Sequence, residues 1–396
     1  MFFLNVNYFK RIWAEVDLDA IAGNVKNLKA HISPTAKMMA VVKADAYGHG
    51  VEHVSRTLEE NRVDCFAVSS LSEAVQLRRL GRTLPILILG YTPPECAADL
   101  AEHNLTQTVY SPEYADALSH AAVNSGCTLS CHIKLDVGMG RLGFNAKSDD
   151  CIAQVEQAAK LPALTFTGIY THFPSADLDG DEDGTITKSQ IALFTKRVEQ
   201  LKTKGIAFAV CHCCNSAGSI AFADGHLDMV REGIALYGLC PSGELQGKVE
   251  LNPAMTLKTV VSMVKTLHKG DTVSYGQTVT LEKDTRVATV CIGYADGYPR
   301  ALSNKGYMMI NGQKAPVLGR VCMDQLLLDV THIDNVKMGT EVTVFGKNGN
   351  TCLPVEEIAA LCPTIHYELV CVLGKRVPRV YLQQGKPVDI TDYIGE

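Results

Sequence analysis

A lysine closes a short apolar run near the start of the chain and is followed at once by polar residues and glycines. The stretch from residue 40 reads AVVKADAYGHG, which places Tyr47 and two glycines within seven positions of Lys43. A lysine at a strand end is most often a solvated residue. The density of polar groups here is unusual for a plain connection, however, and such loops commonly carry function. A buried amine with a lowered pKa can attack a carbonyl carbon and form a Schiff base.

Further polar residues end or follow later apolar runs: Lys134 and Arg141 in LSCHIKLDVGMGRLGF, His172 in FTGIYTHF, Asn215 and Ser216 in AVCHCCNS, and Arg231 and Gly233 in MVREGIALY. Each has an ordinary alternative when taken alone, such as a surface ion pair, a core histidine or a helix cap. Together they describe a pocket for an anion. Ser216 and the amides near Gly233 would open helices, whose first N–H groups bind phosphate without a metal. A phosphate site and a Schiff-base lysine together indicate pyridoxal 5'-phosphate, PLP.

The elements that must position these residues alternate regularly over the first part of the chain. Eight short β-rich runs are separated by segments with helical periodicity, and they cover residues 38–44, 64–70, 85–90, 106–111, 129–137, 166–173, 209–216 and 229–237. This alternation predicts an α/β fold, an N-terminal (β/α)8 TIM-like barrel, with an open doubly wound sheet as the rival. A barrel would gather the polar residues at the carboxyl ends of its strands.

After residue 252 the pattern changes to alternating β runs with Asn-Gly turns, which predicts a mostly β C-terminal domain. We therefore expect a barrel domain over 12–251, a β-rich domain over 252–396, and an N-terminal extension over 1–11. The 396 residues are enough for two such domains.

Charge and cysteine content limit the classes of partner and the cellular location that we expect for this protein. A formal net charge of −6 argues against nucleic acid or an anionic membrane as the main partner and favours a small molecule. The 14 cysteines lack the spacing of a disulfide framework and indicate reduced thiols. No signal peptide or apolar run of about 20 residues is evident, so we expect a cytoplasmic protein. The CHCC run is read as strand residues on opposite faces, and we expect no metal site.

The sequence resembles the alanine racemases, a family of barrel-type PLP enzymes. Motifs similar to those of the family run in order from WAEVDLDAI to KRVPRVY, and they include AVVKADAYGHG, KLDVGMGRLGF, THFPSAD, NSAGS, REGIALYG, VSYG, IGYADGYPR and GRVCMDQ. A lone lysine motif would be weak support, whereas eight in order are strong. One departure is Glu232, which stands where the family frequently has a proline.

The resemblance implies a role for each matching residue. Lys43 would hold the cofactor as a Schiff base, and its phosphate would be bound by Tyr47, Ser216, Gly233, Ile234 and Tyr367. His172 would lie against the pyridine ring, supported by His212, with Asn215 nearby. Arg231 would face the pyridine nitrogen without giving up its proton.

Racemisation requires two acid/base groups on opposite faces of the α-carbon. The resemblance implies that these are Lys43 and Tyr275, with Tyr275 acting on the cofactor of the neighbouring subunit of a homodimer. Arg141 and Met323 would bind the substrate carboxylate region, Tyr294 would line the entry, and Lys134 would be carbamylated and orient Arg141.

The family's activity is the interconversion of L- and D-alanine, with D-alanine used for peptidoglycan. A serine or broad-specificity racemase is the closest alternative, and Tyr367 favours alanine because serine-racemising relatives tend to carry a smaller polar residue there. An amino-acid decarboxylase on the same barrel would lack the SYG motif. A non-catalytic PLP-binding protein would be a single barrel, so the β-rich domain disfavours it.

Overall fold

Two compact units make up the chain in a computed structural model that describes residues 10–178, 180–349 and 351–395. One unit takes the chain from Ala20 to Ala46 and from Val51 to Asn252. The other takes the chain through Asp19, the short segment Tyr47–Gly50, and the chain from Pro253 onward. Residues 1–9 of the expected N-terminal extension lie outside the described residues.

The first unit is a closed parallel barrel, as predicted. Its strands follow one another around the barrel as β2 (Lys37–Val41), β3 (Cys65–Val68), β4 (Ile86–Ile88), β5 (Thr106–Val109), β6 (Leu129–Asp136), β8 (Leu164–Tyr170), β9 (Val210–His212) and β10 (Met229–Glu232). Pairing of β10 with β2 closes the ring, and β7 (Phe144–Asn145) adds to β6. All eight predicted strands are confirmed, and the open sheet is excluded.

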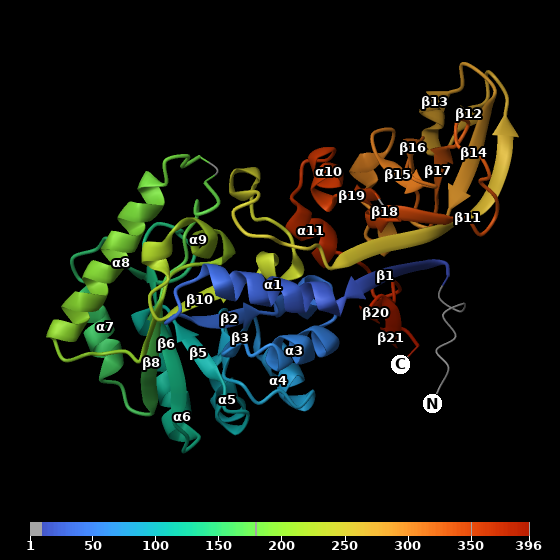
Figure 1. The fold of residues 1–396 in the computed structure, drawn as a ribbon. Helices are drawn as coiled ribbons and strands as arrows, with labels where there is room; N and C mark the ends of the chain where they lie inside the picture. Colours follow the sequence, from blue (N-terminus) through green and yellow to red (C-terminus); the bar gives the residue numbers. More distant parts are fainter. Residues whose placement is uncertain (1–9, 179, 350, 396) are drawn as a thin grey trace. The chain divides into compact units, whose positions relative to one another are not determined.

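Helices surround the barrel strands (Figure 1). They are α1 (Leu18–His31), α3 (Val51–Glu60), α4 (Leu71–Arg79), α5 (Ala97–Glu102), α6 (Pro112–Asn124), α7 (Cys151–Ala159), α8 (Thr185–Thr203) and α9 (Ser216–Ala221). The helix α4 shows why such segments begin where they do. Ser70 accepts a hydrogen bond from the N–H of Glu73, and the Glu73 side chain returns one to Ser70, a capping box that fixes the start of the helix.

The second unit is built on a ten-stranded sheet. The strand order is β19 (Thr351–Leu353), β18 (Glu341–Asn348), β15 (Tyr307–Ile310), β16 (Gln313–Leu318), β17 (Leu326–Asp329), β14 (Thr285–Val290), β11 (Met255–Leu267), β1 (Ile12–Asp17), β20 (Arg379–Gln383) and β21 (Lys386–Thr391). It also holds a small pair, β12 (Thr272–Val273) and β13 (Val279–Thr280), and two short helices, α10 (Val355–Ala360) and α11 (His366–Cys371). The mostly β C-terminal domain is confirmed.

Strand β1 belongs to a different domain from the one that the sequence predicted. Residues 12–17 precede the barrel in the chain and were expected to belong to it, but β1 pairs with β11 and β20 in the other sheet. The reason is non-local, because the hydrogen-bonding edge that β1 fills is formed by strands more than 200 residues away. Asn311 and Gly312 have positive φ and join β15 to β16, as the Asn-Gly turn predicted.

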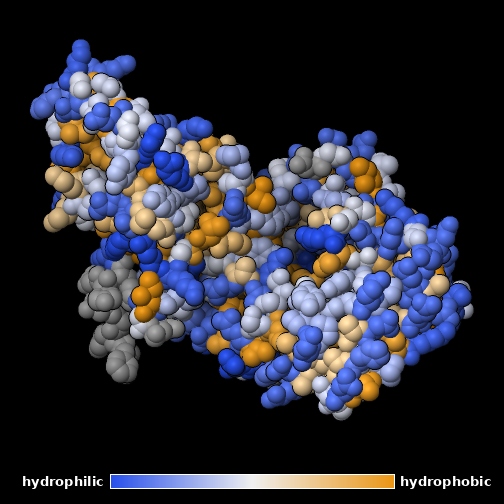
Figure 2. Space-filling model, turned by 180° about the vertical axis from the view of Figure 1, so that it is seen from behind, coloured by the Kyte–Doolittle hydropathy of each residue, from blue (hydrophilic) through white to orange (hydrophobic). Residues whose placement is uncertain are grey.

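The surface mixes hydrophobic and hydrophilic residues (Figure 2), and the cysteines form no disulfides. On the face drawn in Figure 2, hydrophobic residues are scattered among hydrophilic ones. All 14 cysteines are free thiols. Within the described residues, no helix combines the length and apolar character that crossing a bilayer requires.

Candidate active site

The structure distributes the predicted site residues over both units. The barrel unit holds Lys43, Lys134, Arg141, His172, Asn215, Ser216, Arg231, Gly233 and Ile234, and the β-rich unit holds Tyr47, Tyr275, Tyr294, Met323 and Tyr367. Most of the barrel residues lie just beyond the carboxyl ends of strands, where barrel active sites are found. The predicted strands extended too far at this end. β2 ends at Val41 and β8 at Tyr170, so Lys43 and His172 lie in the loops that follow.

Lys43 opens a turn with left-handed backbone. The φ/ψ angles are 52°/51° at Ala44, 54°/49° at Asp45 and 53°/52° at Ala46, and Tyr47 has φ 53°. Left-handed helical conformation costs roughly 1–2 kcal/mol per non-glycine residue. Such strain persists only where the surrounding structure enforces it, and it concentrates at functional sites.

Hydrogen bonds from the backbone and from two side chains hold this turn. The N–H of Ala44 donates to Oε1 of Glu73 at 2.7 Å, and Oδ1 of Asp45 accepts from the N–H of Val51 at 2.8 Å. The N–H of Ala46 donates to the carbonyl of Val42 at 2.9 Å. Asp45, which had no role in the sequence analysis, therefore ties the turn to the start of α3.

Arg231 is the centre of a buried polar network. Its Nη2 donates to the carbonyls of Thr171 at 2.7 Å and Cys213 at 3.0 Å, and it lies 3.4 Å from Nδ1 of His172. Its Nη1 donates to Nδ1 of His212 at 3.0 Å. None of these contacts uses Nε, so the guanidinium keeps an N–H for a further acceptor.

Two buried histidines continue the network. Nε2 of His212 lies 3.1 Å from Nδ1 of His132. Burial, followed by the charge of Arg231, lowers the pKa of His212 well below its ordinary value and that of His132 to about 4, so both rings are neutral. His132 was missed in the sequence analysis. It could have been found, because it lies two residues before Lys134 and so shares a strand face with it.

Tyr170 packs against the network through its ring. Its ring is fully buried and stacks on His212 with centroids 4.8 Å apart. Nζ of Lys134 lies 5.6 Å and Cζ of Arg231 lies 5.2 Å from its centroid, both within cation–π range. On the same strand, a Cβ at Gly168 would lie 2.5 Å from the His132 ring, so only glycine leaves room for that ring.

The site is strongly cationic. Burial lowers the pKa of His172 well below its ordinary value, and the charges of Arg231, Lys134, Arg141 and Lys43 lower it further. Burial also lowers the pKa of Lys134 to about 8, with Arg141, Arg231 and Lys43 acting in the same direction and Asp136 opposing them. A concentration of positive charge next to a neutral imidazole favours an anionic ligand.

Ser216 and Gly233 meet at one edge of the site. The N–H of Gly233 donates to Oγ of Ser216 at 2.7 Å. The helix cap beside them is Asn215 rather than Ser216, because Oδ1 of Asn215 accepts from the N–H of Gly218 at 2.9 Å. Ile234 begins the short 3-10 helix that follows Gly233. The Ser216 hydroxyl proton is not used in the bond from Gly233.

In the β-rich unit, two of the predicted phosphate ligands lie close to each other. The rings of Tyr47 and Tyr367 have centroids 6.5 Å apart. Burial raises the pKa of Tyr47 strongly, so its hydroxyl keeps its proton. The turn after Tyr47 is tightly packed, and a Cβ at Gly48 would lie 2.0 Å from the carbonyl oxygen of Val370. Glycine is therefore required at residue 48 by packing as well as by its φ of 78°.

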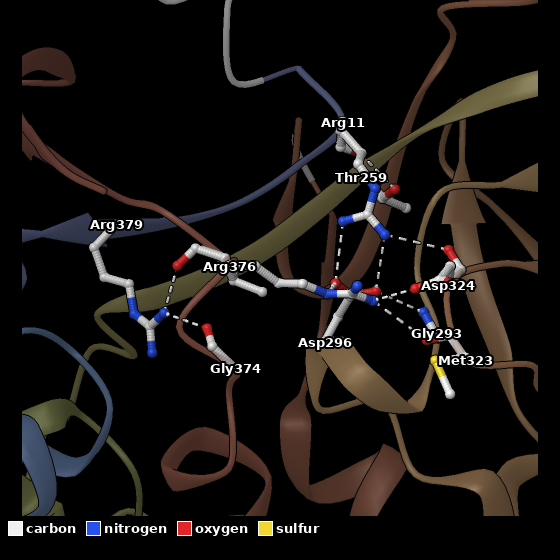
Figure 3. A network of polar contacts seen from close by, with 10 residues as sticks. Arg11, Thr259, Gly293, Asp296, Met323, Asp324, Gly374, Arg376 and Arg379 are labelled. Atoms are coloured by element: carbon white, nitrogen blue, oxygen red, sulfur yellow. Dashed lines mark hydrogen bonds and ion pairs between the residues drawn. The ribbon is translucent and has the colours of Figure 1, made fainter. Parts of the chain in front are cut away.

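The predicted substrate residues of this unit lie on two loops that Asp296 holds together (Figure 3). The carboxylate of Asp296 is fully buried and accepts from Nη1 of Arg11 at 3.1 Å and from Nε of Arg376 at 2.8 Å. Nη2 of Arg376 continues to the carbonyl of Met323 at 3.4 Å and to Oδ1 of Asp324 at 2.6 Å. The segment containing Tyr294 is thereby clamped to the segment containing Met323.

Tyr275 is placed differently from the other candidates. It lies in a short 3-10 helix, Tyr275–Gln277, and is 72% exposed, with Gly276 at φ 70°. Oγ of Ser274 donates to the carbonyl of Arg320 at 2.7 Å, which anchors the base of this segment. Tyr294 and Met323 are also exposed. The described residues contain no group of three or more His, Cys, Asp or Glu side chains arranged to hold a metal ion.

Comparison with known proteins decides the family. Residues 16–241 match the family described as alanine racemase, N-terminal domain, and residues 254–381 match alanine racemase, C-terminal domain. The chain belongs to the alanine racemase family. It is 45% identical to the alanine racemase of Desulforamulus reducens over 94% of this chain and 99% of that protein. It is 44% identical to the alanine racemase of Methanococcus maripaludis over 94% of this chain and 98% of that protein.

Solved structures of the alanine racemase family agree in fold. The alanine racemase of Clostridium difficile 630 superposes with a TM-score of 0.91 at 37% identity, covering 97% of this chain and 99% of that one. The alanine racemase of Bacillus anthracis with bound L-Ala-P gives a TM-score of 0.92 at 35% identity, covering 98% of this chain and 99% of that one. This chain is thus an enzyme of the alanine racemase family in both sequence and architecture.

Proposed function

We propose that this enzyme interconverts L-alanine and D-alanine with PLP as cofactor, by a two-base mechanism that uses Lys43 and Tyr275 of the partner subunit. The D-alanine so formed would serve peptidoglycan synthesis. The observation that carries the proposal is the cationic cluster in the barrel. The charges of Lys43, Arg141 and Arg231 all act on one neutral imidazole, His172, in a chain that matches both alanine racemase domains.

The residues present fit PLP. The cofactor carries a phosphate and the substrate carries a carboxylate, and the positive charges of Lys43, Arg141 and Arg231 around His172 suit both anions. The unused Nε–H of Arg231 suits the acceptor nitrogen of a pyridine. The neutral ring of His172 suits packing against an aromatic face.

When bound, PLP withdraws electrons from the α-carbon of an amino acid and acidifies its proton. Arg231 would donate a hydrogen bond to the pyridine nitrogen but cannot transfer its proton, because guanidinium stays charged in proteins. His212 and the carbonyls of Thr171 and Cys213 keep the guanidinium in one plane. Ser216, Gly233, Ile234, Tyr47 and Tyr367 would bind the phosphate, with Asn215 setting the start of α9.

Lys43 would hold the cofactor and move a proton at Nζ on one face of the substrate. Its left-handed turn fixes where the lysine stem leaves the backbone, which is the positioning that proton transfer needs. Tyr275 would move a proton at its hydroxyl on the other face. A tyrosine that is 72% exposed in its own chain is available to the site of a second chain, which supports a homodimer.

Arg141 would bind the substrate carboxylate region with the N–H of Met323, and Tyr294 would line the entry. Carbamylation of Lys134 would place an anion next to Arg141. The surroundings favour this modification, because a pKa of about 8 gives Lys134 a substantial neutral fraction near neutral pH, and the neutral amine is the form that reacts with CO2.

The first test is Lys43→Ala. We expect loss of the absorbance of covalently held cofactor and a fall in racemisation of at least about 100-fold. The matched control is Lys196→Ala, on the exposed face of α8, which should retain both. Wild-type racemisation by Lys43→Ala would contradict the assignment.

The second test follows α-proton exchange in deuterated water across a panel of amino acids. Tyr275→Phe should slow exchange of L-alanine far more than exchange of D-alanine, since each base serves one face. The control is Tyr91→Phe, a tyrosine that is 58% exposed in the barrel unit. Equal slowing in both directions would contradict the two-base arrangement, and faster exchange of serine than of alanine would point to a different substrate.

A further inference from the structure

Arg141, the predicted ligand of the substrate carboxylate, lies on the loop that joins β6 to β7 in the barrel unit. The loop reads VGMGRLG over residues 137–143. Gly138, Gly140 and Gly143 have φ of 147°, 69° and 134°, which lie in the region that favours glycine. Glycine has no Cβ and therefore has more accessible backbone conformations than other residues. The sequence of the loop does not by itself fix the position of Arg141.

The side chain of Arg141 is not held by contacts of its own. It is exposed, and among the residues that the structure describes its guanidinium forms no hydrogen bond or ion pair. Together with Asp136 and Lys147 it lines a cavity of about 490 Å³. The position of the guanidinium therefore depends on the backbone that carries it.

The Asp136 carboxylate holds that backbone at two points. Its Oδ1 accepts from the N–H of Gly138 at 2.8 Å, and its Oδ2 accepts from the N–H of Gly140 at 2.9 Å. Within the described part of the chain, no other hydrogen bond reaches residues 138–142. A Cβ at Gly140 would meet no atom within 4 Å, so packing does not hold this point either. The two hydrogen bonds to Asp136 therefore decide the path of the loop before Arg141.

Asp136 is itself fixed in the sheet. It is the last residue of β6 and pairs with Asn145 of β7. Its carbonyl accepts from the N–H of Ala146 at 2.9 Å. A Cβ at Gly143 would lie 2.6 Å from the backbone nitrogen of Asp136, so the end of the loop packs directly on this residue. Both ends of the loop are thus joined to Asp136, and its carboxylate is a fixed anchor for the residues between them.

We propose that Asp136 is a positioning residue for substrate binding, because its carboxylate holds the loop in the shape that presents Arg141 to the substrate carboxylate. The inference rests on the proposed function, in which Arg141 binds that carboxylate region. The ordinary alternative is a local turn that only stabilises the fold, since aspartate often accepts from the N–H two residues further on. The two roles differ in one respect. A positioning effect on substrate binding requires Arg141, whereas a structural effect does not.

The first experiment measures the Kd of propionate for the full-length, PLP-loaded enzyme by calorimetry. Propionate has the carbon skeleton and the carboxylate of alanine but no amino group, so it reports carboxylate binding without turnover. Asp136→Asn keeps one acceptor oxygen and loses the other, and we expect the Kd to rise about 10-fold, as for one hydrogen bond to a charged acceptor. The substitution also removes a negative charge, which alone would tighten the binding of an anion. Weaker binding therefore reports the loop and not the charge.

The second experiment repeats the substitution in an Arg141→Met background. Arg141→Met alone should raise the Kd of propionate. Asp136→Asn should then weaken binding no further, because the residue that it positions is gone. Asp149→Asn, at an exposed position before α7, is the matched control and should leave the Kd unchanged in both backgrounds. In alanine racemisation, Asp136→Asn should raise KM by a similar factor and change kcat less.

Amide hydrogen exchange measures the loop without any substrate. The N–H groups of Gly138 and Gly140 should exchange faster in Asp136→Asn than in the wild type, because at least one of them loses its acceptor. Arg141→Met should leave their exchange unchanged, since the Arg141 side chain does not hold the loop.

Propionate binding that Asp136→Asn leaves unchanged or tightens would overturn the proposal, as would equal weakening with and without Arg141. An unchanged Kd in Arg141→Met would instead overturn the role that the proposed function gives to Arg141. If Asp136→Asn does not fold, Gly140→Ala decides the question. It changes no charge and meets no clash, but alanine disfavours a φ of 69°, so propionate should bind about threefold more weakly, and only where Arg141 is present. Unaltered binding in Gly140→Ala would overturn the proposal.

Discussion

Nη1 of Arg231 lies 3.0 Å from Nδ1 of His212, and this contact fixes the tautomers of two buried histidines. Arginine is only a donor, so Nδ1 of His212 must accept and its proton must reside on Nε2. That Nε2 then donates to Nδ1 of His132, 3.1 Å away. The guanidinium is thus oriented by a neutral imidazole pair rather than by a carboxylate.

The first prediction concerns His212→Phe. The aromatic ring can still stack on Tyr170, but Arg231 and His132 each lose a buried partner, so we expect the free energy of unfolding to fall by about 2 kcal/mol or more. Denaturant unfolding at pH 7.5 measures this. His120→Phe, at an exposed position of α6, should change it by less than about 0.5 kcal/mol.

The same variant has a pH signature. The pKa of folded His212 lies well below the unfolded value of about 6.5, so the unfolded state binds more protons as pH falls. The part of the wild-type free energy of unfolding that depends on neutral His212 is fully present above about pH 6.5. It decreases as the pH falls below that value. The difference in stability between wild type and His212→Phe should therefore shrink on acidification, and a constant difference from pH 7.5 to pH 5 would contradict the neutral pair.

The second prediction concerns Glu73→Gln. Oε1 of Glu73 accepts from the N–H of Ala44, and Oε2 accepts from the N–H of Ser69 at 2.7 Å. An amide has one oxygen, so it can accept only one of these two hydrogen bonds. The left-handed turn that carries Lys43 should loosen, with kcat falling about 10-fold or more and KM changing less. Glu60→Gln, exposed at the end of α3, is the control. Unchanged kcat in Glu73→Gln would show that the turn holds without it.

The third prediction concerns Asp296→Asn. The substitution leaves Arg11 and Arg376 facing a buried amide, and we expect the free energy of unfolding to fall by about 2–4 kcal/mol. Because the loops of Tyr294 and Met323 would loosen, KM for alanine should also rise. Asp324→Asn removes a carboxylate that is 55% exposed and contacts Arg376 as well, so it should cost less than about 1 kcal/mol. Equal effects of the two substitutions would refute the clamp.

The fourth prediction concerns Lys134. With ¹³C-labelled CO2, NMR should detect a carbamate in the wild type that is absent from Lys134→Gln. The signal should grow as pH rises toward 8, because only the neutral amine reacts and the pKa of Lys134 is lowered to about 8. Arg141→Met removes the largest of the cationic contributions and should shift this growth to higher pH. A bare ammonium in a high-resolution map would contradict the modification.

Local sequence determined much of this protein. The eight β-rich runs and the helical segments between them predicted a barrel because a period of 2 and a period of 3.6 are imposed by backbone geometry alone. The Asn311-Gly312 turn followed from the two residues that most readily adopt positive φ. Lys43, His172 and Arg231 were predicted as site residues because polar residues at the carboxyl ends of buried strands meet at one end of a barrel.

Tertiary structure decided the rest. The strand β1 lies in the β-rich sheet because its pairing edge comes from β11 and β20, which no local pattern reveals. The left-handed turn after Lys43 contains no glycine until residue 48, so its conformation is enforced by Glu73 and Val51, not by its own residue types. Glu232 was noted in the sequence only as a departure from proline. Burial raises the pKa of Glu232 to about 7, and complete burial is a property of the folded barrel and not of the residue.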